Sequence, residues 1–399
     1  MRKPSVVSRV SPILADKYLF VEVETTDGRV GVGESGAWAY IEPVAAVLQK
    51  FGTYLLGKDA SLIEHHWDVM RRFGSYSGAV SMGALSAIDV ALWDLKGQRL
   101  GEPIHALLGG PYRSRVRVYG HAKGRSRGEL VSACGALKDA GFTAVGHVNP
   151  FLDEDIGVPL ALTYTQRMRQ GVATLEAVRE RIGNDVDLCV ELHRRLTPAE
   201  AIAFGRMIGH VTPLFFEDPV RPDSTVAMAS VQANLEIAVA TGERLYSLEQ
   251  FHALLSSGAA RYIRPSIGLC GGITGARRIA ALAQAFDVPV VPHNTYSPVA
   301  TMASLHFVAA TPNFLIMEYP TASFTDNVVG TDLMATQLTT AAPRQVDGYV
   351  PVGDAPGLGT ALIPDVAGLF PYRAIHVDMR TQIKQLFFCK FPESGFGLL

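Results

Sequence analysis

The sequence predicts an α/β protein in which a TIM-type barrel follows a smaller N-terminal α+β domain. From Val116 onward, short apolar runs alternate with helical segments, and eight such runs can be counted. Continuous apolar runs are typical of buried parallel strands, and eight strands alternating with helices are typical of a barrel. The expected strands are Val116–His121, Ala144–Asn149, Asp187–His193, Leu214–Pro219, Glu236–Glu243, Arg261–Ile267, Pro289–Asn294 and Phe314–Tyr319.

Helical segments are expected between these strands. Thr197 followed directly by Pro198 is a clear helix start, because a capping residue precedes proline at the first helical position. Residues 150–170 are expected to form a long insertion, a lid or a lip, after the second strand. The expected helices are Gly128–Ala140, Gly171–Ile182, Pro198–Ile208, Leu248–Leu255 and Gly275–Phe286.

The first 112 residues have a different pattern and predict the α+β domain. Tyr18–Thr25 and Arg29–Glu34 are strand-like, and the Thr-Asp-Gly sequence between them is a hairpin turn signal. Ser81–Lys96 has apolar residues at helical spacing. Gly109-Gly110-Pro111 then interrupts the pattern.

Composition excludes several classes of protein. The formal charge is −2 and the cations are spread along the chain, so no nucleic-acid surface is expected. No apolar run approaches the roughly 20 residues needed to cross a bilayer, and no signal peptide is expected. The four cysteines form no CxxC pair, so we expect neither zinc nor disulfides and a location in the reducing cytoplasm.

Three glutamates follow successive apolar runs at a constant spacing. Glu217 lies 26 residues after Glu191, and Glu243 lies 26 residues after Glu217. Strand ends of successive βα units meet at one rim of a barrel, where the chemistry of this fold is found. Three carboxylates there predict a site for Mg²⁺, which prefers oxygen ligands. Such an ion can bind a substrate carboxylate and neutralise the charge formed when the α-proton is removed.

Two histidines are candidate acid and base groups beside this ion. His193 lies two residues beyond Glu191, so it is expected on the same side of that strand. His293 ends another strand, roughly across the ring, and the two imidazoles could act on opposite sides of one carbon.

Several sequence segments together make the chain resemble the enolase superfamily. Within it, the chain is similar to the mandelate racemase-like group that includes acid-sugar dehydratases of the galactonate and mannonate type. The resemblance covers roughly residues 5–365. The segments that carry it are Ser86–Gly97, Glu191–Pro198, Phe216–Pro219, Thr241–Arg244, Cys270–Thr274 and Pro292–Asn294.

The resemblance implies a modified (β/α)7β barrel with an N-terminal α+β capping domain. The implied boundaries are residues 1–112 for the cap, 113–325 for the barrel and 326–399 for a C-terminal segment that returns to the cap. It also implies that Mg²⁺ is the cofactor, that its ligands are the three glutamates, and that the protein is a symmetric homo-oligomer acting on a small carboxylate.

The resemblance further assigns roles to individual residues. It implies that His193 protonates a departing hydroxyl, that His293 is the partner base or acid, and that Glu318 contacts the substrate or intermediate. Trp38 and Tyr40 lie in the cap stretch expected to close over the barrel mouth. Candidate substrate-binding residues are Trp38, Tyr40, Asn149 and Arg264, and His147 is a further candidate catalytic residue.

Three positions depart from the pattern of the family. The first metal ligand is usually Asp, and Glu191 replaces it here with one more methylene. The second strand usually carries a lysine, and Gly146 or His147 stands there, which excludes a lysine base. Most relatives have Asp where Ser266 stands, and a hydroxyl stabilises an imidazolium less than a carboxylate does, so His293 is expected to be a weaker base.

These observations favour an Mg²⁺-dependent hydro-lyase that dehydrates an acid sugar. Loss of the α-proton would give an enediolate, and loss of the β-hydroxyl would give a 2-keto-3-deoxy acid. One alternative is a racemase or epimerase of a 2-hydroxy acid that uses His147 and His293. Another is a weakly active or inactive member that serves as a binding protein, and cycloisomerase chemistry on the same fold is a further alternative.

Overall fold

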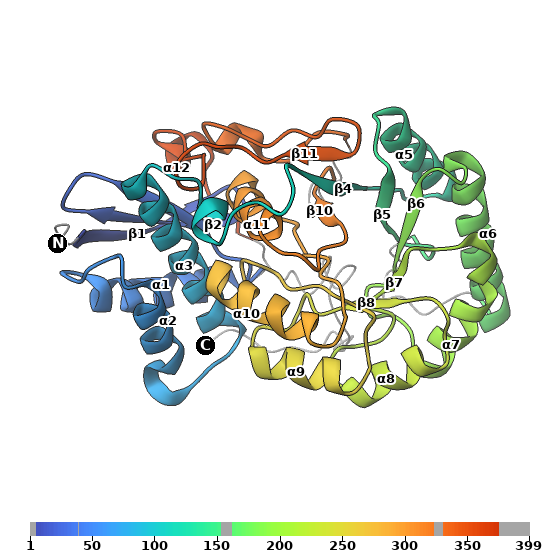
Figure 1. Ribbon diagram of the computed structural model, residues 1–399. Coiled ribbons are helices and arrows are strands. Elements are labelled where there is room, and N and C mark those ends of the chain that lie inside the picture. The colour runs from blue at the N-terminus through green and yellow to red at the C-terminus, as the bar shows by residue number, and fades with distance from the viewer. Residues whose placement is uncertain (1–4, 39, 153–161, 323–329, 375–399) are drawn as a thin grey trace, which may run out of the picture.

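The computed structural model describes residues 5–38, 40–152, 162–322 and 330–374. An N-terminal cap lies beside a barrel whose strands are surrounded by helices (Figure 1). The predicted fold class is therefore confirmed. No helix in these ranges is long and apolar enough to cross a membrane.

An antiparallel sheet in the order β1-β2-β3 forms one layer of the cap. The expected hairpin is present as β2 (Tyr18–Thr25) and β3 (Val30–Glu34), and its turn contains Gly28 at φ 84°. β1 (Val7–Ala15) was not expected from the sequence, because most of its residues are only partly buried and it lacks a continuous apolar run. The other cap elements are α1 (Ile41–Leu55), α2 (Ile63–Arg72), η1 (Phe73–Ser75), α3 (Ala79–Leu100) and α4 (Ile104–Leu107).

Helix α3 packs directly on β3 because two glycines leave room for it. A Cβ atom on Gly33 would lie 1.9 Å from the carbonyl oxygen of Ala87, and one on Gly31 would lie 2.2 Å from that of Ala91. The close approach buries α3 over most of its length. The predicted helix Ser81–Lys96 is confirmed, and it extends further at both ends.

The barrel contains the eight predicted strand positions, although the regular strands are shorter than expected. Parallel pairing gives the order β10-β4-β5-β6-β7-β8-β9. Val290 fills the eighth position, because it bridges in parallel to Ile263 and to Phe314 and so closes the ring. The strands are β4 (Arg115–His121), β5 (Ala144–Val148), β6 (Asp187–Glu191), β7 (Phe215–Glu217), β8 (Val239–Thr241), β9 (Tyr262–Ile263) and β10 (Met317–Tyr319).

The barrel interior is filled by one layer of apolar side chains. Nearly every strand contributes a buried residue to this layer, so the barrel is a packed core rather than a pore. Its buried members are Tyr119, Ala144, Cys189, Phe215, Ala240, Val291 and Ile316.

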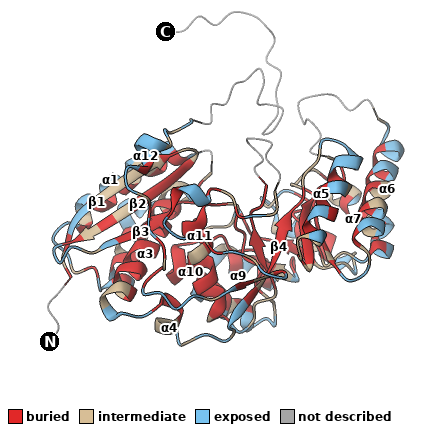
Figure 2. Ribbon diagram, turned by 90° about the horizontal axis from the view of Figure 1, so that it is seen from above, coloured by how far each residue is buried: buried red, intermediate tan, exposed pale blue. Residues whose placement is uncertain are grey.

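Helices surround the barrel, with exposed residues on their outer faces (Figure 2). The five expected helices are present, and α8 and α11 are additional to those expected. Helix α6 starts at Tyr164, where the Thr163 side chain accepts a hydrogen bond from the backbone N–H of Gln166. The expectation of an insertion through residue 170 is therefore wrong for its last seven residues, and residues 153–161 lie outside the described ranges. The helices are α5 (Arg127–Asp139), α6 (Tyr164–Ile182), α7 (Pro198–Met207), α8 (Thr225–Ala233), α9 (Leu248–Ser256), α10 (Gly272–Gln284) and α11 (Pro298–Ala309), with η2 at Gly209–Val211.

The cap is joined to the barrel by buried polar contacts. The Glu34 carboxylate accepts hydrogen bonds from the Ser297 hydroxyl at 2.5 Å and from the backbone N–H of Ala300 at 3.1 Å. The backbone N–H of Gly36 donates to the carbonyl of Gly268 at 2.7 Å. These contacts hold the end of β3 and the following loop against the start of α11 and the loop after β9.

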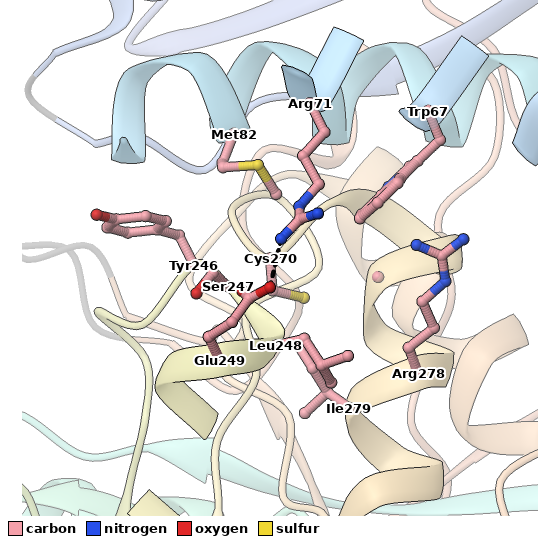
Figure 3. Close-up of a pocket in the computed structure, with 11 residues that line it drawn as sticks. Trp67, Arg71, Met82, Tyr246, Ser247, Leu248, Glu249, Cys270, Arg278 and Ile279 are labelled. Atoms are coloured by element: carbon pink, nitrogen blue, oxygen red, sulfur yellow. Dashed lines mark hydrogen bonds and ion pairs between the residues drawn. The ribbon is translucent and has the colours of Figure 1, made fainter. Parts of the chain in front are cut away.

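A second contact between cap and barrel surrounds a small pocket (Figure 3). Arg278 of α10 lies over the Trp67 ring of α2, 4.1 Å from its centroid, and Trp67 Nε1 donates to the carbonyl of Gly271 at 2.9 Å. Arg71 of α2 forms an ion pair with Glu249 of α9. Both ion-paired side chains are partly exposed, so this pair contributes little stability.

The chain beyond β10 contacts both parts of the molecule. β11 (Tyr349–Pro351) pairs antiparallel with β4, and α12 (Val366–Leu369) packs near β1. The backbone N–H of Asp16 donates to the carbonyl of Phe370 at 2.9 Å. A further short helix is η3 (Thr336–Leu338).

Candidate active site

A polar layer lies directly above the apolar layer of the barrel. Side chains alternate along a strand, so the residue two positions beyond each inward-facing residue also faces inward. The eight residues that face inward above the apolar layer are all buried, and all except the two glycines carry ionisable side chains. They are His121, Gly146, Glu191, Glu217, Gly242, Arg264, His293 and Glu318.

Two of the three predicted metal ligands are neighbours in this layer. Glu191 at the end of β6 is the register partner of Glu217 at the end of β7. Burial raises the pKa of Glu191 to about 7, although His193 opposes the shift. Burial also raises the pKa of Glu217 well above its usual value, despite the nearby Arg264 guanidinium.

Arg264 lies beneath the mouth with no exposed surface and forms ion pairs with Glu217 and Glu318. Its Nη2 donates to Glu318 Oε2 at 2.6 Å. Burial would raise the pKa of Glu318, but Arg264, together with His293 and His121, lowers it to about 2. The contacts of Arg264 are with protein groups, and its role in substrate binding stays a prediction.

The third predicted ligand, Glu243, lies two residues beyond β8 and has several cationic neighbours. Its Oε1 accepts from Arg194 Nη1 at 2.7 Å and pairs with Arg244 Nε at 2.9 Å. His293 Nε2 lies 3.4 Å from its Oε2. Burial opposes ionisation, but His293 and the arginines hold the pKa of Glu243 well below its usual value.

His193 lies beside Glu191, but not for the expected reason. Strand β6 ends at Glu191, and His193 follows in a left-handed conformation with φ 49°. The expectation that His193 continues the strand is therefore wrong. Its backbone N–H donates to Glu191 Oε1 at 2.5 Å, so the turn itself holds His193 next to that carboxylate.

His147 enters the mouth through an irregularity in β5. The pairing of β5 with β6 shifts register between Val145 and Val148, and His147 between them has φ 56°. Such irregularities re-aim side chains near active sites. The His147 ring lies 4.5 Å from the His193 ring and 5.0 Å from the His121 ring, between centroids.

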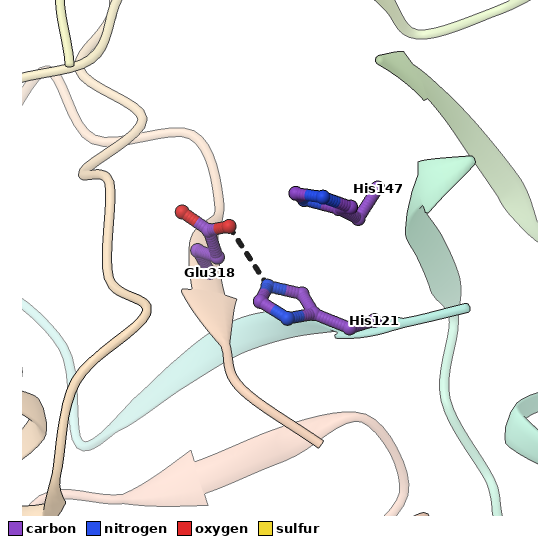
Figure 4. Close-up of side chains that lie close together, drawn as sticks. All are labelled: His121, His147 and Glu318. Carbon is purple, nitrogen blue, oxygen red and sulfur yellow. Dashed lines mark hydrogen bonds and ion pairs between the residues drawn. The ribbon is translucent and has the colours of Figure 1, made fainter. Parts of the chain in front are cut away.

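His121 is a residue of this site that the sequence reasoning missed. It ends β4 and is fully buried, and its Nε2 lies 2.8 Å from Glu318 Oε1 (Figure 4). Its position at the end of the first barrel strand was a usable signal, because the other site residues end strands in the same way.

Ser266 and His293 are bridge partners on neighbouring strand positions. The Ser266 hydroxyl is hydrogen bonded to the Tyr296 hydroxyl at 2.8 Å, and the Tyr296 ring lies edge-on to His293. Burial lowers the pKa of His293, although Glu243 and Glu318 oppose the shift. A lowered pKa favours the neutral form of His293, and a neutral imidazole can accept a proton.

The remaining candidate residues are two in the cap and one after β5. Trp38 follows the Gly36 contact with the barrel, whereas Tyr40 is 65% exposed at the start of α1. Asn149 follows β5 and its side-chain oxygen accepts from the backbone N–H of Phe151 at 2.9 Å. Substrate contacts by these three residues stay a prediction.

The chemistry of the donor set fits a hard divalent cation. Carboxylate oxygens are the ligands that such ions prefer. Burial raises the pKa of Glu191 and Glu217, and a bound cation would favour their ionised forms. Two groups in the described ranges have possible ligand atoms within 4.8 Å of one another: His147, Glu191 and His193, and His121, His147 and Glu318. Glu217 and Glu243 belong to neither group; Glu217 pairs with Arg264, and Glu243 pairs with Arg194. The trio of glutamate ligands therefore stays a prediction.

Comparison with known proteins gives the family. Residues 1–109 match the N-terminal domain of mandelate racemase and muconate lactonizing enzyme, and residues 129–366 match the enolase C-terminal domain-like family. The chain belongs to the enolase superfamily. The resemblance inferred from the sequence is thereby confirmed.

Individual relatives agree with this assignment. A D-galactonate dehydratase from Verminephrobacter eiseniae is 30% identical over 347 residues, which cover 87% of this chain and 89% of the relative. A Salmonella enterica protein, provisionally described as a dehydratase, has a TM-score of 0.84 at 28% identity, covering 92% of this chain and 98% of its own. A provisionally described galactarate dehydratase from Agrobacterium radiobacter, with bound Na and L-malate, has a TM-score of 0.83 at 27% identity, covering 92% and 95%.

These relatives support the expected enzyme class, a lyase of the hydro-lyase type. Metal binding is typical of the enolase superfamily, and the carboxylate and imidazole groups described above provide a possible site for an ion.

Proposed function

We propose that the protein is an Mg²⁺-dependent dehydratase of a sugar acid. The observation that carries the proposal is the ring of buried ionisable groups at the barrel mouth, in which His193 and His147 lie beside Glu191 while His293 lies beside Glu243. Relatives named D-galactonate dehydratase support this chemistry at about 30% identity. Glu191, Glu217 and Glu243 would hold the ion, which would stabilise negative charge on the substrate carboxylate when bound.

The positions of His193 and His293 in the ring of strands suit them to separate acid and base roles. His193 follows β6, and His293 follows the strand position of Val290, four places away in a closed ring of eight. They therefore face a substrate from opposite sides. In the proposed reaction, neutral His293 Nε2 removes the α-proton, and protonated His193 donates a proton to the β-hydroxyl, which leaves as water. The product would be a 2-keto-3-deoxy acid.

His121 and Arg264 would fix the orientation of the Glu318 carboxylate, which in turn would position the substrate. The Glu318 carboxylate accepts from His121, Arg264 and the backbone N–H of Asn294, so its orientation is fixed. A carboxylate held in this way can accept hydrogen bonds from substrate hydroxyls above it. Trp38 and Asn149 are further proposed contacts at the mouth.

The position of His147 favours one second candidate, a racemase or epimerase. The register shift of β5 brings the His147 ring into the mouth, and His147 and His293 would then exchange protons on the two faces of one carbon. Exchange of the α-hydrogen with solvent deuterium, without loss of water, would identify this reaction.

A library of sugar acids, incubated with the protein and Mg²⁺, tests the proposal. The expected result is a 2-keto product from at least one acid, and its formation should be lost with a chelator and restored by Mg²⁺. Absence of any 2-keto product across the library would contradict the proposed function. We further propose that the protein is a cytoplasmic homo-oligomer whose partner is a small carboxylate, without nucleic-acid or membrane partners.

A further inference from the structure

Arg194 places a cation inside the cluster of carboxylates at the barrel mouth. Its Nη1 donates to Asp218 Oδ2 and to Glu243 Oε1, each at 2.7 Å. The Arg194 side chain is 18% exposed, and those of Asp218 and Glu243 are 1% and 9% exposed. Buried ion pairs of this kind are screened little by solvent.

The backbone holds Arg194 in this place. Arg194 has φ 64°, and the preceding His193 has φ 49°. Left-handed conformations are unfavourable for residues other than glycine and persist only where the surrounding structure supports them. Here the backbone N–H of Arg194 donates to the carbonyl of Asp218 at 2.7 Å.

Glu243 is also one of the three predicted ligands of the divalent cation. A guanidinium and a divalent cation near one carboxylate repel each other, and each lowers the affinity of the carboxylate for the other. Arg194 should therefore lower the affinity of the site for a divalent cation, in addition to any contribution it makes to folding.

We propose that Arg194 is an internal counter-cation that competes with the divalent ion for Glu243 and sets the metal affinity of the site. The proposal rests on the metal site of the proposed function. In the protein without metal, Arg194 neutralises Glu243 and Asp218. Binding of the ion requires Arg194 to loosen its contact with Glu243, while Asp218 retains the guanidinium nearby.

Binding of Mn²⁺ to the full chain, measured by the electron paramagnetic resonance signal of the free ion, tests the proposal. Arg194→Gln removes the positive charge and keeps a hydrogen-bonding side chain. We expect this variant to bind Mn²⁺ at least tenfold more tightly than the wild type, whereas Arg194→Lys should remain within about threefold of it. If Arg194 has only a structural role, R194Q will bind Mn²⁺ equally or more weakly, which would overturn the proposal.

Two further variants supply the controls. Arg221→Gln also removes one positive charge, from an exposed side chain that pairs with Asp223, and it should leave the Mn²⁺ affinity unchanged. Arg244→Gln removes the other guanidinium on Glu243 Oε1, whose side chain is 45% exposed, and it should tighten binding less than R194Q does. If R194Q does not fold, unchanged affinity in R244Q would overturn the proposal.

The outcomes also separate this inference from the proposed function. Equal Mn²⁺ affinity in wild type and R194Q would overturn the inference alone and leave the metal-dependent reaction intact. Absence of Mn²⁺ binding in both proteins would overturn the inference and the proposed function together.

Discussion

Arg264 donates to Glu318 at 2.6 Å in the interior of the barrel, and neither side chain is exposed by more than 1%. The same guanidinium pairs with Glu217 on the other side and lies over the rings of Tyr119 and Phe215 below. One cation thus connects a predicted metal ligand with the carboxylate proposed to orient the substrate.

Arg264→Met should strongly destabilise the protein. Methionine removes the cation but leaves Glu217 and Glu318 buried, and breaking a buried pair in this way costs about 3–5 kcal/mol. Denaturant unfolding measures the loss. The exposed Arg261→Gln in the same segment is the control and should change stability by less than about 0.5 kcal/mol. A loss below about 1 kcal/mol for R264M would contradict the structural role of this pair.

His193→Asn should lower kcat and leave KM within a few-fold of the wild type. The expected loss in kcat is about 10²–10⁴-fold, the usual contribution of a general acid or base. Steady-state kinetics on the acid sugar found in the library experiment measure it. The exposed His252→Gln should retain full activity. Unchanged kcat in H193N would remove His193 from the reaction.

Gly33→Ala should destabilise the cap, because the new methyl group would lie 1.9 Å from the carbonyl oxygen of Ala87 and would force β3 away from α3. Overpacking of this kind costs about 1–3 kcal/mol or more. Thermal unfolding measures the effect. Gly209→Ala is a matched control, because a Cβ there would meet nothing within 4 Å. Equal melting temperatures in both variants would show that β3 and α3 are not in close contact.

Stability should fall as pH decreases from about 6.5 towards 4, in part because of His306. Burial lowers the pKa of His306 from 6.5 to about 4, so between these values the unfolded chain binds a proton that the folded protein does not. Above about pH 6.5 the folded protein has its full unfolding free energy with respect to this group. About 3 kcal/mol of it is lost as the pH falls from there through about 4. His306→Gln should make the slope of unfolding free energy against pH shallower over this range, whereas the exposed His65→Gln should leave it unchanged. An unaltered slope in H306Q would contradict this account.

The sequence was sufficient to predict the barrel and most of the residues at its mouth. Buried strands required continuous apolar runs, and the residues that ended those runs, including Glu191, Glu217 and Glu318, lie in one polar layer. His121 ended a predicted strand in the same way and could have been included. Helices α8 and α11 were missed. Helix α11 is buried on all sides, so its sequence has no polar face and shows no helical alternation of polar and apolar residues.

Other features could not be read from the sequence. His147, His193 and Arg194 reach their places through positive φ angles, and no residue type in these positions indicates a left-handed conformation as glycine would. The contact of Arg194 with Asp218 and Glu243 depends on those turns. The pairing of Ser266 with Tyr296 joins residues 30 positions apart, so it too required the fold.

Crystallography with Mn²⁺ is the sharpest test of the proposed metal ligands, because the anomalous signal of the ion locates it without assumptions about those ligands. We expect one strong peak coordinated by Glu191, Glu217 and Glu243. Absence of a peak among these three carboxylates, or a single peak held by His121, His147 and Glu318 instead, would contradict this expectation.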